Sequence, residues 1–221
     1  MRFDTVLIAN RGEIAVRIIR ACREQNLGCV SVYSTADRDA LHVKFADRAV
    51  CIGAPATADS YLRMDSIIEA CRQTGATAVH PGFGFLSENA EFAKLCREND
   101  ITFIGPSPEC IAMLGDKAQA KETMKAAGVP VIPGSEGALH SIEEAKEIAK
   151  KIGYPVLVKA SAGGGGRGMR NVDRMEDLES AFERAKSEAK MAFGDEDVYL
   201  EKCIMNPKHI EVQIMGDEHG H

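Results

Sequence analysis

The sequence contains no tryptophan and few other aromatic residues. Of its 221 residues, 4 are tyrosine and 8 are phenylalanine, so it offers few side chains on which nucleic-acid bases could stack. Acidic residues outnumber basic ones, 33 against 27, and the formal net charge is -6. Because binding to a nucleic-acid backbone needs a basic surface, this composition argues against nucleic acid as the main partner.

The sequence also lacks the cysteine pairs that metal sites and redox motifs require. The cysteines number seven, an odd count, and no two of them have a Cys-x-x-Cys spacing. Most lie in apolar runs, so we interpret them as small buried residues of a protein in a reducing compartment. The apolar run after Asp4 is too short for a signal sequence or a membrane span. We therefore expect a cytoplasmic protein with no membrane contact.

Apolar runs alternate with amphipathic helical patterns through the first half of the chain. Hydrophobic residues make up 45% and charged residues 27%, values typical of soluble globular proteins, and the length allows one large domain or two small ones. The predicted strands are 6–9, 29–33, 49–52, 76–80 and 101–104, and the predicted helices begin near 12, 64 and 87, the last with Ser87 as its N-cap. Short apolar strands separated by helices predict a parallel sheet covered on both faces.

A helical linker and a small α+β unit are predicted next. Ser107 followed by Pro108 is a helix start, Asp116 with Gln119 resembles a capping box, and Gly128 ends that helix. The small unit, at about 131–203, contains a helix capped by Ser141 and Glu144 that stops at Gly153, a strand at 156–159, a long helix with one apolar face from Met175 to Ala189, and a strand at 198–204.

The last residues have the two-residue periodicity of a strand. Ile210, Val212 and Ile214 alternate with polar residues, which predicts a half-buried strand. A turn at 216–220 follows, and the sequence stops at His221 with no second strand to cover the open edge. We therefore expect the sequence to end inside a larger domain.

Lys159 and the glycine-rich loop after it carry the strongest chemical signal. Lys159 closes an apolar strand, where its ammonium would need an anion to offset lost solvation. The segment 161–168 has five glycines in six positions and contains Arg167; glycine lets several backbone N–H groups point toward one anion. The loop is neither a Walker motif nor a dinucleotide fingerprint. A snorkelling lysine and a flexible linker are the alternatives, but together the features favour a phosphate cradle.

Three further segments carry polar residues in positions that could form a site. The turn 9–15 follows the first strand, where open α/β sheets bind ligands, although its single glycine supports a dinucleotide site only weakly. The turn 80–89 begins at His80, which we interpret as a hydrogen-bonded structural residue. His209, Glu211 and Gln213 share one face of the last predicted strand, which could be a solvated edge or the wall of a site.

Together these segments resemble the signatures of the biotin carboxylases, the ATP-dependent components of acetyl-CoA carboxylase, which serves fatty acid biosynthesis, and of propionyl-CoA and pyruvate carboxylase. The matching segments, in the family's order and spacing, are ANRGEIAVR at 9–17, HPGFGFLSEN at 80–89, GDK at 115–117, YPVLVKASAGGGGRGMR at 154–170 and EKCIMNPKHIEVQ at 201–213. The resemblance covers essentially the whole chain. It implies an α/β protein of the ATP-grasp fold, in which nucleotide lies between a mobile lid and a C-terminal domain.

The resemblance also implies roles for individual residues. Lys117 and Lys159 resemble the two family lysines that contact ATP phosphates, and Gly165 and Gly166 match the lid loop that closes over those phosphates. The hinge strand that meets the adenine in the family is matched by Glu201, Lys202, Cys203 and Ile204. A family histidine that contacts the nucleotide is matched by His209. Ala162 and Cys203 depart from the commoner residues without touching the proposed charges. Without nucleotide, we expect the loop to be mobile.

For the intact protein, the resemblance implies that ATP, Mg²⁺ and bicarbonate are used to carboxylate biotin on its carrier protein. A carboxyltransferase subunit and a homodimer are implied as well. The family's Mg²⁺ and bicarbonate ligands and its catalytic arginine lie beyond position 221, so we expect no catalytic residue or metal ligand here and no turnover by this chain alone. The implied parts are a Rossmann-like N-terminal biotin carboxylase domain at 1–113, a helical linker at 114–130, an ATP-grasp lid at 131–203 and the start of the C-terminal domain at 204–221.

Two alternatives stay open at this point. Another ATP-grasp ligase, either like carbamoyl-phosphate synthetase or acting on urea, has a similar lid loop, but the segments 9–17 and 80–89 favour biotin. The second alternative is a non-catalytic folding or interface module. Such a module would differ from a biotin carboxylase and from the other ligases because it would bind no ATP.

Overall fold

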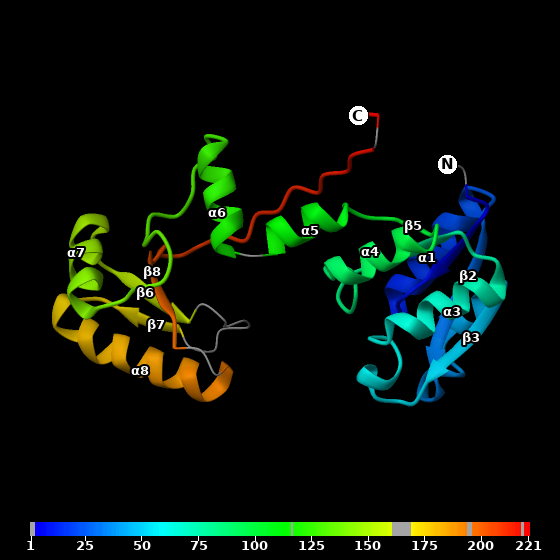
Figure 1. The fold of residues 1–221 in the computed structure, drawn as a ribbon, viewed down its shortest axis with the longest axis horizontal. Helices are drawn as coiled ribbons and strands as arrows, with labels where there is room; N and C mark the ends of the chain where they lie inside the picture. Colours follow the sequence, from blue (N-terminus) through cyan, green and yellow to red (C-terminus); the bar gives the residue numbers. More distant parts are fainter. Residues whose placement is uncertain (1–2, 116, 161–168, 194–195, 218) are drawn as a thin grey trace. The chain divides into compact units, whose positions relative to one another are not determined.

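The computed structural model describes residues 3–115, 117–160, 169–193, 196–217 and 219–221, with only the backbone at 117–119 and 192–193. The chain divides into two compact units, Met1–Ala120 and Lys121–His221 (Figure 1). Among the described helices, none combines the length and the apolar composition needed to cross a membrane.

The first unit is built on a five-stranded parallel sheet with the order β3-β2-β1-β4-β5. Its strands are β1 (Thr5–Ile8), β2 (Gly28–Ser34), β3 (Arg48–Gly53), β4 (Ala78–His80) and β5 (Thr102–Phe103). The central strand β1 is buried through Val6, Leu7 and Ile8, none of them more than 1% exposed. A strand that is apolar at consecutive positions must bury both of its faces, as the sequence predicted.

Helices cover both faces of this sheet. They are α1 (Gly12–Glu24), α2 (Leu41–Phe45), α3 (Met64–Thr74) and α4 (Ala90–Glu98), with short 3₁₀ turns at Thr35–Asp37 and Thr57–Asp59. A further helix, α5 (Pro108–Gly115), packs against α4. Leu7 belongs to a core that includes Ile67 of α3 and Phe92 of α4. Val6 and Ile8 belong to a second core with Ile18 of α1. The alternation of side chains along β1 therefore separates the two layers of helices, and the predicted covered parallel sheet is confirmed.

The predicted start of α4 was wrong by three residues. Ser87 lies in a turn, where its N–H donates to the carbonyl of Gly84 at 2.9 Å, and the helix begins at Ala90. Asn89 is the N-cap, because its side-chain oxygen accepts from the N–H of Phe92 at 2.8 Å. An asparagine satisfies a free helix N–H as well as serine does, so the local sequence offered two equivalent caps.

The predicted linker is helical. Ser107 Oγ accepts from the N–H of Cys110 at 3.2 Å and so caps α5, as predicted. The next helix, α6 (Lys117–Ala126), is followed by Gly128, whose φ is +76°. The N–H of Val129 donates to the carbonyl of Met124 at 2.9 Å, the closing bond of a Schellman motif. The predicted capping box of Asp116 with Gln119 lies outside the described residues.

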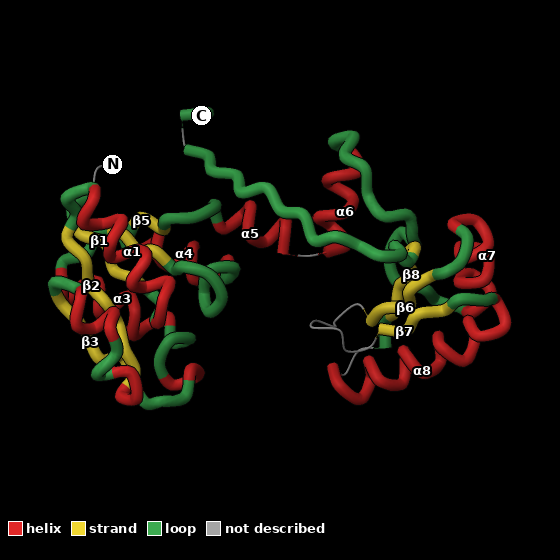
Figure 2. Tube along the Cα trace, turned by 180° about the vertical axis from the view of Figure 1, so that it is seen from behind, coloured by secondary structure: helices red, strands yellow, loops and turns green. Residues whose placement is uncertain are grey.

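The second unit has a three-stranded antiparallel sheet with the order β7-β6-β8. Its strands are β6 (Val156–Ala160), β7 (Met169–Val172) and β8 (Val198–Lys202), and its two long helices are α7 (Ile142–Ile152) and α8 (Met175–Phe193) (Figure 2). Val156, Val158 and Leu200 form a core with Ala149 of α7 and Phe182 of α8. The predicted α+β unit is confirmed, with β8 ending two residues earlier than predicted.

The capping box of α7 differs from the predicted form in one bond. Ser141 Oγ accepts from the N–H of Glu144 at 3.1 Å, as predicted. The Glu144 carboxylate accepts from the N–H of His140 at 3.0 Å, one residue before the position expected in a capping box. The helix is followed by Gly153 at a φ of +77°, where the sequence predicted its end.

The predicted half-buried strand near the C-terminus was wrong. Residues 203–217 contain no strand, and Ile210, Val212 and Ile214 are 82%, 78% and 80% exposed. Alternation gives a segment an apolar face, but a strand also needs a neighbour for its N–H and C=O groups. Within the described residues no segment pairs with 204–217. The predicted turn is present, since Asp217 Oδ1 accepts from the N–H groups of His219 and His221 at 2.9 Å each.

Candidate functional site

The candidate site is a charged cluster around Glu201 in the second unit. Lys159 Nζ lies 2.6 Å from Glu201 Oε2, and Lys121 Nζ lies 3.4 Å from Glu201 Oε1. The side chain of Glu201 is 13% exposed, against 23% for Lys159 and 26% for Lys121. Two ammonium groups against one carboxylate leave one positive charge in surplus at a half-buried position, which favours an anionic ligand.

Strand register places Lys159 and Glu201 on the same face of the sheet. Lys159 of β6 pairs with Tyr199 of β8, and Leu157 pairs with Glu201. In an antiparallel sheet, diagonal neighbours on one face are close enough for long side chains to meet. The opposite face, with Val158 and Leu200, is fully buried against the helices. The core therefore fixes the strand orientation that turns Lys159 and Glu201 outward.

Tyr199 extends the cluster along β8. Lys159 Nζ lies 5.9 Å from the centroid of its ring, within the range of a cation–π contact. Burial raises the pKa of Tyr199, and the nearby Lys159 ammonium opposes that increase. The phenol therefore stays neutral at physiological pH and contributes a flat wall beside the lysine.

Gly134 allows a loop to approach β8 directly beside Glu201. It forms an isolated antiparallel bridge with Glu201, and a Cβ on it would lie 2.3 Å from the carbonyl oxygen of Leu200. The next residue, Ser135, donates its N–H to that same oxygen at 2.8 Å, and its Oγ accepts from the N–H of Leu200 at 3.1 Å. The loop therefore covers the outer edge of β8 beside Glu201.

The residues after Glu201 make backbone contacts that continue the strand edge. The N–H of Lys202 donates to the carbonyl of Pro133 at 2.8 Å, and the N–H of Cys203 donates to that of Pro155 at 3.0 Å. The ammonium of Lys202 donates to the carbonyls of Gly153 and Tyr154 at 3.0 and 2.7 Å. The Lys202 ammonium thus donates to carbonyls of the second unit itself, and the side chain lies on the face of β8 opposite to Glu201.

Two of the candidates lie away from this cluster, in the extended C-terminal segment. Ile204 is 49% exposed. The side chain of His209 is 88% exposed and its ring lies 3.3 Å from the carboxylate of Glu211. Among the described residues no hydrogen bond joins His209 to Lys159 or Glu201. The structure therefore brings together Lys159 and Glu201 of the predicted set, but not His209.

The predicted phosphate cradle lies outside the described residues. Gly165, Gly166 and Arg167 belong to the undescribed segment 161–168. The prediction that this loop is mobile therefore also concerns residues that the structure does not describe. Lys117 begins α6, but its side chain is not described.

Sequence reasoning missed Lys121 and Gly134. A signal for Lys121 was present, because Lys117, Lys121 and Lys125 recur every four residues in α6, the spacing that places side chains on one helix face. Lys125 pairs with Glu136 at 2.7 Å, so two residues of this series contact the loop and strand around Gly134. No local signal marked Gly134, because its need for close approach depends on its bridge to Glu201, 67 positions later in the chain.

In the first unit, the two predicted turns meet at the carboxyl ends of β1 and β4. Asn10 Nδ2 donates to the carbonyls of Pro81 and Phe83 at 2.7 and 2.8 Å. His80 Nδ1 accepts from the N–H of Gly82 at 3.0 Å, and burial lowers the pKa of His80, which favours the neutral ring that this bond requires. The contacts agree with the interpretation of His80 as a hydrogen-bonded structural residue.

Arg11 lies in the same turn and packs on an aromatic pair. Its guanidinium carbon is 5.2 Å from the ring centroid of Tyr61 and 5.5 Å from that of Phe85, and its Nη1 lies 3.4 Å from Asp37. Burial favours a higher pKa for Asp37, but hydrogen bonds from Tyr61, Ser34 and Arg11 outweigh it and hold the pKa below its usual value. Burial and the hydrogen bond to Asp37 raise the pKa of Tyr61 to about 12. These bonds attach the turn to the body of the first unit.

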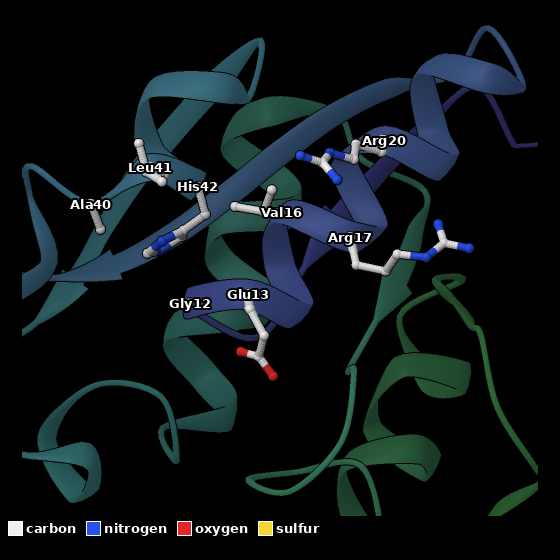
Figure 3. A pocket seen from close by; sticks show the side chains of 8 residues that line it. All are labelled: Gly12, Glu13, Val16, Arg17, Arg20, Ala40, Leu41 and His42. Atoms are coloured by element: carbon white, nitrogen blue, oxygen red, sulfur yellow. The ribbon is translucent and has the colours of Figure 1, made fainter.

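A shallow pocket of about 430 Å³ lies between α1 and the segment 40–42 (Figure 3). Its lining residues are Gly12, Glu13, Val16, Arg17, Arg20, Ala40, Leu41 and His42. The side chains of Glu13 and Arg17 point away from His42, and burial lowers the pKa of His42. Within the residues that the structure describes, no group of three or more His, Cys, Asp or Glu could hold a metal ion.

Comparison with known proteins gives two family matches in succession. Residues 2–111 match the biotin carboxylase N-terminal domain, and residues 116–221 match the ATP-binding domain of the carbamoyl-phosphate synthase L chain. The biotin carboxylase of Nostoc sp. is 56% identical over 220 residues, which is 100% of this chain and 49% of that protein. That of Halalkalibacterium halodurans is 56% identical over 99% of this chain and 48% of that protein. The chain thus spans about half the length of these relatives.

Solved structures give the same result. A biotin carboxylase–β-γ-ATP complex from Campylobacter jejuni has a TM-score of 0.84 and 52% identity, covering 93% of this chain and 46% of that one. The biotin carboxylase domain dimer of Hydrogenobacter thermophilus 2-oxoglutarate carboxylase, with MgADP, ADP and bicarbonate, has a TM-score of 0.81 and 53% identity over 93% of this chain and 45% of that one. Since the two domain models match in succession and the relatives align with nearly all 221 residues, the chain belongs to the biotin carboxylase family of ATP-grasp proteins.

Proposed function

We propose that this chain supplies part of the ATP site of a biotin carboxylase, which uses ATP and bicarbonate to carboxylate biotin. The observation that carries the proposal is the Lys159–Glu201–Lys121 cluster, with its surplus positive charge directly before the glycine-rich segment. Support also comes from similar structures described as complexes with MgADP and bicarbonate and with β-γ-ATP. The first step would be attack of a bicarbonate oxygen on the γ-phosphorus of ATP, which breaks the bond to the β,γ-bridging oxygen, releases ADP and forms carboxyphosphate. Decomposition of carboxyphosphate would break its bond between carbon and the phosphate oxygen and release CO₂ and inorganic phosphate beside biotin. The ureido nitrogen would then lose its proton, which the phosphate can accept, and form a bond to the carbon of CO₂.

In this proposal the residues of the chain orient and screen the nucleotide. Lys159 and Lys117 contact the phosphates and offset their charge, and Gly165 and Gly166 close over them. The backbone of 201–204 meets the adenine, and His209 reaches the nucleotide. Fixed positive charges placed where charge develops are the main source of catalysis in phosphoryl transfer. For His209, the proposal requires a rearrangement of residues 204–217, because its ring is paired with Glu211 in this structure.

When bound, Mg²⁺ would supply positive charge that offsets the charge of the phosphates. From the resemblance to the family, we propose that its ligands lie in the part of the relatives beyond the match. We further propose the boundaries 1–113 for the N-terminal domain, 114–130 for the linker, 131–203 for the lid and 204–221 for the start of the C-terminal domain. A homodimer, a biotin carrier protein and a carboxyltransferase subunit complete the proposed assembly.

A carbamoyl-phosphate-synthetase-like ligase is the second candidate. The match of residues 116–221 to the ATP-binding domain of that enzyme favours it, because this half carries Lys159 and Glu201. The first half matches the biotin carboxylase N-terminal domain instead. The nucleotide site is therefore common to both candidates, and the first half favours biotin as the acceptor.

The proposal predicts that the purified chain binds ATP. Isothermal titration with ATP is expected to give saturable heat at a stoichiometry near one. Adenosine should bind more weakly, because it lacks the phosphates that Lys159 would contact. A chain that serves only as a structural module would show no saturable heat with either ligand, and that result would reject the proposal.

The chain alone is expected to show no biotin-dependent turnover. It spans about half the length of its relatives, and we place the metal and bicarbonate ligands beyond the match. Phosphate release from ATP would be measured with bicarbonate and with or without free biotin. The expected result is the same background rate in both. A rate that rises with biotin and saturates would place a complete active site within these 221 residues and contradict the expectation.

A further inference from the structure

Glu201 connects two lysines that would otherwise repel each other. Its two oxygens are divided between them, Oε2 with Lys159 at 2.6 Å and Oε1 with Lys121 at 3.4 Å. The three side chains are each between 13% and 26% exposed, so solvent screens them less than a surface pair. The carboxylate is therefore the counter-ion for both ammonium groups when no ligand is bound.

This arrangement creates a competition at Lys159. If Lys159 binds nucleotide phosphate, as proposed above, the phosphate competes with Glu201 Oε2 for the charge and the hydrogen bonds of the ammonium. A buried carboxylate left without a cation is costly, so the loss of Lys159 opposes binding unless another cation stays with Glu201. Lys121 already contacts the other oxygen and comes from a different element, α6.

The position of α6 keeps Lys121 at the cluster independently of Lys159. Four residues farther along the same helix, Lys125 pairs with Glu136 at 2.7 Å. Glu136 follows the segment whose Gly134 and Ser135 bond to β8. The helix is thus attached to the β8 edge at two successive turns, and the contact between Lys121 and Glu201 needs no contribution from the Lys159 ammonium.

We propose that Lys121 is a positioning residue of the nucleotide site, which holds Glu201 by Oε1 and so releases the Lys159 ammonium to nucleotide phosphate. The inference rests on the proposed function. It assigns Lys121 no contact with the nucleotide. Lys121 would affect nucleotide affinity through the competition between Glu201 and phosphate for Lys159. The effect of Lys121 therefore requires both the phosphates of the nucleotide and the charge of Glu201.

The test is isothermal titration of the wild-type chain and of Lys121→Met with ATP and with adenosine. Without Lys121, Glu201 pairs with Lys159 alone, so ATP affinity is expected to fall about three- to tenfold, the range for one partly screened ion pair. Adenosine affinity should stay the same. Lys121→Arg keeps the charge and should bind ATP within about twofold of wild type. The matched control is Lys146→Met, which removes an exposed lysine of α7 that pairs with Glu179 and should not change the ratio of the two affinities.

A double-mutant cycle separates this role from direct phosphate binding. In a Glu201→Gln background there is no carboxylate charge to hold, so adding Lys121→Met should have no further effect on the ATP-to-adenosine ratio. The same loss in both backgrounds would overturn the inference, because Lys121 would then act on phosphate directly. An unchanged ratio in Lys121→Met alone would also overturn it. Failure of the wild-type chain to bind ATP would instead reject the proposed function.

Discussion

Lys159→Met is expected to weaken ATP binding by about 100-fold, because it removes a charge-assisted hydrogen bond to phosphate and leaves an opposing charge behind. Glu201 is 13% exposed and lies on the same sheet face as Lys159. With Lys159 gone, its Oε2 would face the phosphates without the partner it has at 2.6 Å. The lost attraction between Lys159 and phosphate and the added repulsion between Glu201 and phosphate both lower ATP affinity. Isothermal titration of the variant with ATP measures the effect.

The control for this experiment is Lys146→Met. Lys146 pairs with Glu179 at 2.9 Å on the exposed surface of α7, so the variant removes the same charge from a residue outside the cluster of Lys159, Glu201 and Lys121. Its ATP affinity should match wild type within about twofold, since exposed pairs contribute little. Adenosine affinity of Lys159→Met should fall much less than ATP affinity. Equal losses for ATP and adenosine would show that Lys159 maintains the fold and does not bind phosphate.

The parts of the fold that the sequence predicted are those determined by local pattern. Val6, Leu7 and Ile8 are consecutive apolar residues, and only a strand buried on both faces accommodates them. Lys159 was predicted at a strand end because a charged residue interrupts an apolar run there. The helix cap at Asn89 was missed in favour of Ser87 because both residues can satisfy a free N–H. Local pattern thus predicts elements more reliably than their boundaries.

The missed features depend on contacts between distant residues. Lys121 and Glu201 are 80 positions apart, and a lysine in a helix rich in lysine gives no sign of which carboxylate it will meet. The strand predicted at 210–214 had a suitable alternation, but alternation specifies only which side chains share a face. Whether such a segment pairs is decided by its neighbour, and in this structure residues 204–217 pair with no described strand. Sequence pattern therefore predicts a candidate residue such as Lys159 but not the cluster around it.

Gly134→Ala is expected to destabilise the second unit by about 2–4 kcal/mol, the sum of overpacking strain and a weakened hydrogen bond. The added Cβ would lie 2.3 Å from the carbonyl oxygen of Leu200 and 3.1 Å from the Cα of Glu201. Both are backbone atoms of β8, so neither can move aside as a flexible side chain could. The loop must separate from the strand, which disrupts the bonds between Ser135 and Leu200.

Urea unfolding followed by circular dichroism measures this loss, and Gly115→Ala is the matched control because a Cβ there meets nothing within 4 Å. The control should unfold at or slightly above the wild-type midpoint, because alanine favours a helix more than glycine does, whereas Gly134→Ala should unfold at lower urea. Displacement of Glu201 should also lower ATP affinity in urea-free buffer, because the carboxylate would no longer lie between Lys121 and Lys159. If Gly134→Ala has the midpoint of Gly115→Ala, the close approach of the loop to β8 does not exist in solution. If its midpoint falls but ATP affinity is unchanged, the loop supports the fold without positioning Glu201.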